Sequence, residues 1–195
     1  MKFAFFCVIS MLALAGCKSE YEQMVDREMA KGIRQDSIFL GMTFGMTRDE
    51  FYKHCWDMNS KGLFMNSPLN NSVEYDISKY LRHPGKAHFY PTFFEDKIYE
   101  MPVMFMYDGF AWQPSYSSDT LMVDVLKMLT SWYGDFKEFS HPQKGNMYVN
   151  INGNRQIRLY KDKLNDVIKG VFTDLTIDKE KVRLALQPSL DTLKH

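Results

Sequence analysis

The chain lacks the sequence features that most directly indicate a catalytic or cofactor site. It has no phosphate-binding loop, no dinucleotide-binding fingerprint and no nucleophile elbow, and no two histidines have the close spacing of a zinc site. Positive charge is not in excess either, because 24 Lys and Arg residues balance 24 Asp and Glu residues. A nucleic-acid partner, which requires a basic stripe, is therefore not expected. We also expect no metal, no cofactor and no enzymatic activity.

Long apolar runs are absent as well. The longest uncharged apolar run, from Phe3 to Leu14, has twelve residues and follows a single positive charge at Lys2. A membrane-spanning helix needs about 20 apolar residues, so this run is too short to be one. A positive residue, a short apolar run and then small residues are typical of an export signal.

The run ends in Leu14-Ala15-Gly16-Cys17, which resembles the lipobox of bacterial lipoproteins. The resemblance implies that residues 1–16 are a lipoprotein signal peptide and that Cys17 carries a diacylglycerol, through which the protein binds a membrane. An ordinary secreted protein or an uncleaved anchor is the alternative. As a whole, the chain looks like the uncharacterised lipoproteins common in Bacteroidetes.

Residues 17–36 are predicted to be the lipidated N-terminus and a tether. Lys18 stands where an aspartate retains lipoproteins in the inner membrane of enteric bacteria, which favours the outer membrane, facing the periplasm or the exterior. The block from Lys18 to Glu22 resembles acidic signals that send some Bacteroidetes lipoproteins to the cell surface, although a solvated linker explains it equally well. A weak helical stripe is formed by Tyr21, Met24, Val25 and Met29.

A single folded domain is expected over residues 37–178. Its first helix begins at Thr47, which has capping-box spacing with Glu50, and its apolar stripe is formed by Phe51, Cys55 and Met58. Gly45-Met46-Thr47 at the start of a capped helix looks like outer-membrane lipoproteins of the BamE (SmpA/OmlA) type, which assist barrel assembly. That family's fold has two helices before its strands, whereas this chain has strands between its helices.

Six strands and a second helix follow the first helix. The second helix is capped by Ser117 or Ser118, runs to about Tyr133, and places Leu121, Met122, Val125, Leu129 and Trp132 on one face. The expected strands are 73–77, 87–94, 97–107, 147–151, 155–160 and 167–177. The predicted fold is therefore α+β, an antiparallel sheet with two helices packed on one face, arranged as two α-β-β-β units. Residues 179–195 form a tail with room for a short helix before Pro188.

Two groups of residues are catalytic candidates. His54 and Cys55 are adjacent on a helix and point about 100° apart, so they do not form a nucleophile and base pair. Cys55 also lies on the apolar stripe, which indicates packing. The acidic residues Glu95, Asp96, Glu100 and Asp108 fall in or near turns, where solvated charge is the ordinary explanation. They leave open a small carboxylate-dependent hydrolase or carbohydrate-acting protein as the alternative function.

Aromatic residues are the most distinctive feature, with ten of them between Phe89 and Tyr116. A strand points alternate side chains to opposite faces, so one helix layer cannot bury both faces of an aromatic hairpin. A core with a few scattered exposed aromatics is the simpler explanation. We nevertheless expect Phe110, Trp112 and Tyr116 to form a binding patch. The favoured function is a lipid-anchored cell-envelope binding or assembly module, whose partner is an envelope protein or a glycan.

Overall fold

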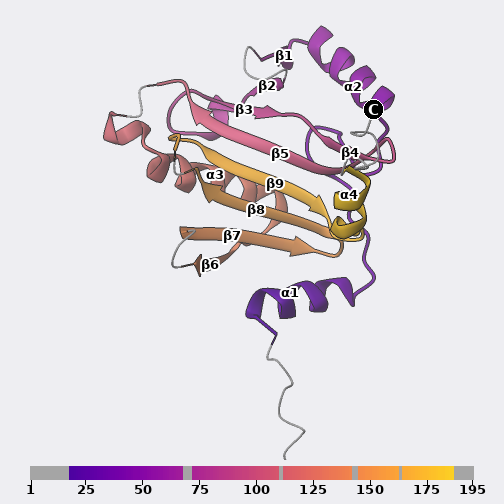
Figure 1. The fold of residues 1–195 in the computed structure, drawn as a ribbon. Helices are drawn as coiled ribbons and strands as arrows, with labels where there is room; N and C mark the ends of the chain where they lie inside the picture. The colour runs from indigo at the N-terminus through magenta and orange to yellow at the C-terminus, as the bar shows by residue number, and fades with distance from the viewer. Residues whose placement is uncertain (1–17, 68–71, 110–111, 142–144, 163, 187–195) are drawn as a thin grey trace, which may run out of the picture.

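The computed structural model describes residues 18–67, 72–109, 112–141, 145–162 and 164–186 (Figure 1). The predicted signal peptide over 1–16, the lipidation site Cys17, Phe110 of the expected patch and the end of the tail from 187 onward lie outside these residues.

A nine-stranded antiparallel sheet forms the centre of the molecule, which confirms the predicted α+β class. The strands follow the order β1-β2-β3-β5-β9-β8-β7-β6, and β4 pairs with β5 beside this path. β5 therefore joins the first group of strands to the second through its antiparallel pairing with β9. The strands are β1 (Phe64–Asn66), β2 (Val73–Asp76), β3 (Gly85–Phe89), β4 (Thr92–Phe94), β5 (Lys97–Tyr107), β6 (Lys137–His141), β7 (Gly145–Asn152), β8 (Arg155–Lys161) and β9 (Ile168–Asp174).

Four α-helices are described: α1 (Glu20–Met29), α2 (Arg48–Ser60), α3 (Ser118–Tyr133) and α4 (Lys179–Leu186). The predicted capping box of α2 is confirmed, because the Thr47 side chain accepts from the Glu50 N–H while Glu50 accepts from the Thr47 N–H at 2.8 Å. α3 begins after the cap Ser117 and ends at Gly134, whose φ of 86° favours glycine. Both predicted helices thus start where their local signals indicate, and α3 also ends at the predicted Tyr133.

The number of strands differs from the expected three per unit. Within the described ranges, five strands lie between α2 and α3, and four lie between α3 and α4. The predicted strand 87–94 is split at Pro91, which has no N–H for the ladder, into β3 and β4. β1 and β6 were missed because β1 has only three residues and the β6 sequence KEFSH contains only one large apolar residue.

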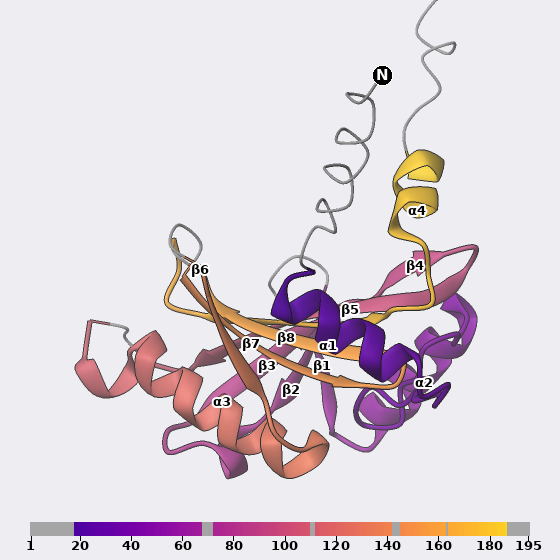
Figure 2. The same cartoon turned by 90° about the horizontal axis from the view of Figure 1, so that it is seen from below.

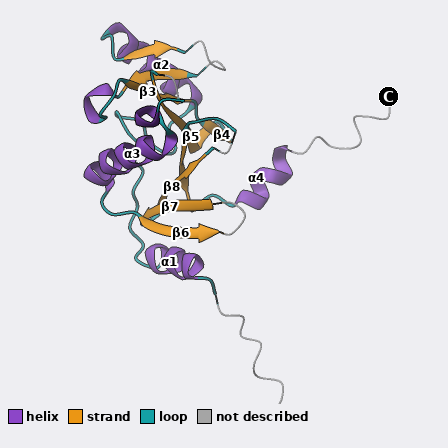
Figure 3. Ribbon diagram, turned by 90° about the vertical axis from the view of Figure 1, so that its left-hand side faces the viewer, coloured by secondary structure: helices purple, strands orange, loops and turns teal. Residues whose placement is uncertain are grey.

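The helices lie on both sides of the sheet. Figure 2 shows α3 on one side of the sheet and α4 on the other, and Figure 3 shows α1 and α2 at opposite ends of the molecule. α3 contacts β5 and β9, α2 contacts β1, and α1 contacts β7. Among the described residues, no helix has both the length and the apolar character needed to cross a bilayer.

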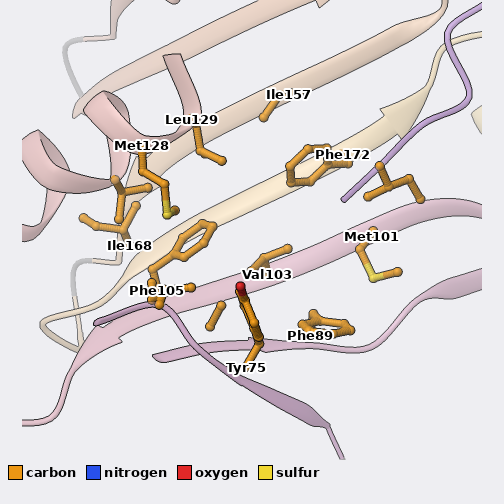
Figure 4. Packing of buried hydrophobic residues seen from close by; sticks show 14 of the residues in the cluster. Tyr75, Phe89, Met101, Val103, Phe105, Met128, Leu129, Ile157, Ile168 and Phe172 are labelled. Carbon is orange, nitrogen blue, oxygen red and sulfur yellow. The ribbon is translucent and has the colours of Figure 1, made fainter. Parts of the chain in front are cut away.

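The core lies between the sheet and α3 (Figure 4). Leu121 and Val125 are fully buried, and Leu129 is 1% exposed, as their position on the α3 stripe predicts. The prediction for Trp132 was less accurate, because this side chain remains 37% exposed. It lies in the last turn of α3 and packs edge-on against Tyr80, which covers only one side of the indole. The strands contribute large buried side chains, among them Tyr75, Phe89, Met101, Val103, Phe105, Ile157, Ile168 and Phe172.

Candidate functional site

Most of the aromatic segment from Phe89 to Tyr116 is used for packing. Phe89, Phe105 and Tyr107 are at most 5% exposed, since they occupy the inward positions of β3 and β5. Trp112 differs sharply, because it is 78% exposed in the loop between β5 and α3. Exposed tryptophans are enriched at binding hot spots, so Trp112 is the strongest candidate within the expected patch for contact with a ligand or partner.

Tyr116 holds the other end of this loop. It belongs to the short 3₁₀ turn η2 (Pro114–Tyr116), and its ring stacks on His83 with centroids 4.4 Å apart. The same ring packs edge-on against Tyr107 at 5.7 Å. Tyr116 is therefore partly buried and fixes the loop, while Trp112 remains largely exposed. Phe110, the third predicted member of the patch, lies outside the described residues.

A buried carboxylate lies behind this aromatic loop. Asp124 on α3 is 5% exposed and accepts from the Arg82 N–H at 2.8 Å, from Arg82 Nε at 2.7 Å and from the Tyr107 hydroxyl at 2.7 Å. Burial alone raises the pKa of Asp124, but these hydrogen bonds outweigh it and keep that pKa below its ordinary value. For Tyr107, burial and the hydrogen bond to Asp124 both raise the pKa. The carboxylate is thus ionised, and both of its oxygens accept hydrogen bonds from Arg82 or Tyr107. Since Tyr116 of the loop packs against Tyr107, Asp124 helps to hold the loop in position.

Arg82, His83 and Asp124 were not among the site residues predicted from the sequence. A signal for Asp124 was present, because it stands among the apolar residues of the second helix, between Leu121 and Val125. A charged residue inside an apolar stripe indicates a buried partner. Arg82 and His83 carried no comparable signal, since they lie in a loop whose approach to α3 depends on the fold.

A groove of about 260 Å³ lies on the sheet. Pro102, Met104 and Val171 are on the sheet face opposite the core residues Met101, Val103 and Phe172, as the alternation of β5 and β9 requires. Among the described residues, no Asp or Glu lines this groove. Its lining consists of Ser72, His88, Phe89, Tyr90, Pro102, Val103, Met104, Tyr160, Lys169, Gly170 and Val171. The groove therefore combines apolar side chains with His88, Tyr160 and Lys169, and it lacks the pair of carboxyl groups that a glycosidase needs.

The four acidic residues considered for hydrolysis do not converge. Asp96 lies 3.6 Å from Arg48, and Asp108 lies 4.0 Å from Lys86. Glu100 accepts from the Thr173 hydroxyl at 3.2 Å and lies 3.7 Å from Lys179. Glu95 occupies the β4–β5 turn with a φ of 48°. In the part of the chain that the structure describes, no three His, Cys, Asp or Glu residues are grouped to hold a metal ion.

Cys55 and His54 do not form a catalytic pair. The His54 ring is held by the Leu40 carbonyl, to which Nε2 donates at 2.8 Å. Cys55 is half-buried against the core, and burial raises the pKa of its thiol to about 11. The thiol is consequently protonated at neutral pH and behaves as a small apolar side chain, as its place on the α2 stripe predicts.

Comparison with known proteins gives no assignment for this chain. No family model, no curated protein and no solved structure matches it.

Proposed function

We propose that this protein is a lipid-anchored binding or assembly module of the cell envelope. Support for the anchor comes from the sequence, in which Leu14-Ala15-Gly16-Cys17 has the order of a lipobox and follows a short apolar run. In this proposal Cys17 carries the lipid, residues 1–16 are removed, and the protein resides at the outer membrane. Its partner is an envelope protein or a glycan.

The observation that carries the binding function is Trp112, which is 78% exposed on a loop that Tyr116 fixes to His83 and Tyr107. A rigid aromatic side chain on an anchored loop buries much area at little cost in conformational entropy, as binding hot spots do. Phe110, two positions before Trp112, extends the proposed patch. Tyr116 holds the loop in place through its contacts with His83 and Tyr107.

Binding is favoured over carboxylate-dependent hydrolysis by two features of the described residues. Glu100, Asp96 and Asp108 each lie beside a cation of their own instead of facing one another. The groove over Pro102 and Met104 has no acidic residue in its lining. A glycosidase, in contrast, needs two carboxyl groups that flank one bond.

The finer arrangement of the fold is also part of the proposal. We infer two related units, each a helix followed by strands that begin at an outer edge of the sheet and end at its centre. The strand order supports this, because β1-β2-β3-β5 and β6-β7-β8-β9 meet where β5 pairs with β9. Phe51 of α2 and Leu129 of α3 belong to one buried cluster, which supports two helices on the same face.

The test uses two tryptophans of equal exposure. Trp112 and Trp56 are both 78% exposed, but Trp56 lies on α2. Photocrosslinking from position 112 in intact cells, followed by identification of the captured envelope component, supplies the partner. We then expect Trp112→Ala to weaken its binding about 5- to 150-fold, the range of a hot spot of about 1–3 kcal/mol. Trp56→Ala is the matched control and should bind like the wild type. Equal binding by the two variants would contradict the proposed site.

A further inference from the structure

The segment predicted to be a tether is held against the folded domain. On β8, the Gln156 side chain is 1% exposed and donates to the Tyr21 hydroxyl of α1 at 2.6 Å. The Tyr21 ring packs edge-on against Phe139 of β6, with centroids 5.9 Å apart. Glu20 accepts from Lys137 of the same strand. α1 is therefore fixed to the β6–β8 end of the sheet through its first turn.

The chain that follows α1 is also fixed. The Gln35 N–H donates to Asn154 Oδ1 at 2.6 Å, and Arg155 Nη1 donates to the Ser37 carbonyl at 2.9 Å. At Gly153, in the turn between β7 and β8, a Cβ atom would lie only 2.0 Å from the Ile33 carbonyl oxygen. This close approach requires glycine and places the linker tightly against the turn. No loose stretch of described chain therefore separates α1 from the domain.

Very little chain remains between α1 and Cys17. α1 begins at Glu20, and its capping box fixes the preceding Ser19, whose N–H donates to Glu22 at 2.7 Å. The Lys18 carbonyl accepts from the Gln23 side chain at 2.8 Å, so this residue also follows the helix. Three residues of fully extended chain span at most about 11 Å, which limits the distance from Cys17 to Glu20.

We propose that the end of the molecule formed by α1 and β6 sits flush against the phospholipid surface in which the lipid on Cys17 is inserted. The inference rests on the proposed lipidation and adds an orientation to it. A lipidated cysteine lies at the bilayer surface, and about 11 Å of chain leaves no room for a gap between that surface and α1. Residues 18–31 contain four acidic residues and three basic ones, and Lys137 balances Glu138 on β6, so this end carries a net charge of −1 and its seating does not depend on anionic lipid.

The opposite end of the molecule consequently points away from the membrane. Figure 1 places α2 and β1 at the far end of the sheet from α1, and Figure 3 shows the same for α2. Ser140 is exposed and follows Phe139, the β6 residue that Tyr21 of α1 contacts. Asp57 is exposed on α2, at the distal end. A label at position 140 should therefore lie close to the bilayer, and a label at position 57 should lie far from it.

The experiment uses the lipidated protein in vesicles of neutral phosphatidylcholine, with Cys55→Ala as background. A fluorophore is attached to Ser140→Cys in one sample and to Asp57→Cys in the other, and lipids with a spin label on the headgroup act as the quencher. We expect several-fold stronger quenching at 140 than at 57. Inserting about 20 Gly and Ser residues between Lys18 and Ser19, with a mean reach of about 25 Å, should abolish the difference.

Two failures can be told apart. A mass spectrum showing that Cys17 carries no lipid would overturn the proposed anchor, and with it this inference. If Cys17 is lipidated but the two labels are quenched equally, the anchor stands and the flush seating is wrong. Quenching at 140 that persists after the insertion would overturn the role of the short tether in this seating, because adsorption of the surface itself would then hold the protein down.

Discussion

Replacing Asp124 with asparagine tests whether the buried carboxylate fixes the aromatic loop and α3 together. The substitution keeps the shape of the side chain but removes its charge and one of its two acceptor oxygens. Tyr107 is 5% exposed, so a hydroxyl left without an acceptor there costs about 1–3 kcal/mol. The Arg82 side chain is 54% exposed and can bind water instead, so loss of its ion pair with Asp124 costs at most about 1 kcal/mol of stability.

These contributions predict a loss of about 2–3 kcal/mol in the free energy of unfolding. For a chain of this size the melting temperature should fall by roughly 5–10 °C, which differential scanning fluorimetry measures readily. Asp119→Asn is the matched control on the same helix, because its side chain is 82% exposed, and it should melt within about 2 °C of the wild type. Equal melting temperatures for the two variants would refute the reasoning.

The same variant has a defined pH dependence. The folded-state pKa of Asp124 lies below its ordinary value of 3.8. The contribution of this carboxylate to the free energy of unfolding is therefore complete above pH 3.8 and is lost as the pH falls below that value. The stability difference between the wild type and Asp124→Asn should therefore be largest near neutrality and shrink below about pH 4. In a double-mutant cycle with Tyr107→Phe, we expect a coupling of about 1–2 kcal/mol. Strict additivity would show that the two side chains act independently.

Three further outcomes are expected. Cys17→Ala should abolish lipid labelling and release the protein from the membrane fraction or leave it unprocessed, and normal fractionation with normal processing would contradict the anchor. Cys55→Ala should cost about 1 kcal/mol in urea unfolding, and the native thiol should react slowly with a maleimide at neutral pH, because its pKa is raised to about 11. Trp112→Ala should lower the melting temperature less than Trp132→Ala, since these side chains are 78% and 37% exposed; the reverse order would place the loop in the core.

Features with a local cause were predictable from the sequence. The start of α2 depends on Thr47 and Glu50, three residues apart, and the β7–β8 turn depends on Asn152 to Asn154. The apolar stripe of α3 was predicted for the same reason, because helical periodicity reports burial residue by residue.

Features that join distant segments were not predictable. Asp124 meets Arg82 across 42 positions, and Tyr21 meets Gln156 across 135, so no periodicity connects them. The second contact is the reason why a segment that looked like a tether carries a docked helix. The exposure of Trp132 was wrongly predicted, because it depends on Tyr80, a residue from a distant segment that packs against only one side of the indole.

The pairing of β5 with β9 has a consequence for the order in which the protein can fold. Glu100 of β5 lies opposite Thr173 of β9, so the centre of the sheet joins residues more than seventy positions apart. Until the chain has emerged as far as Asp174, β5 has an unpaired edge and its apolar residues Met101, Val103 and Phe105 lack the cover of Phe172. Such an edge is prone to pair with another chain. In the proposed export from its N-terminus, the chain must therefore keep its first half from aggregating until almost all of the domain has crossed.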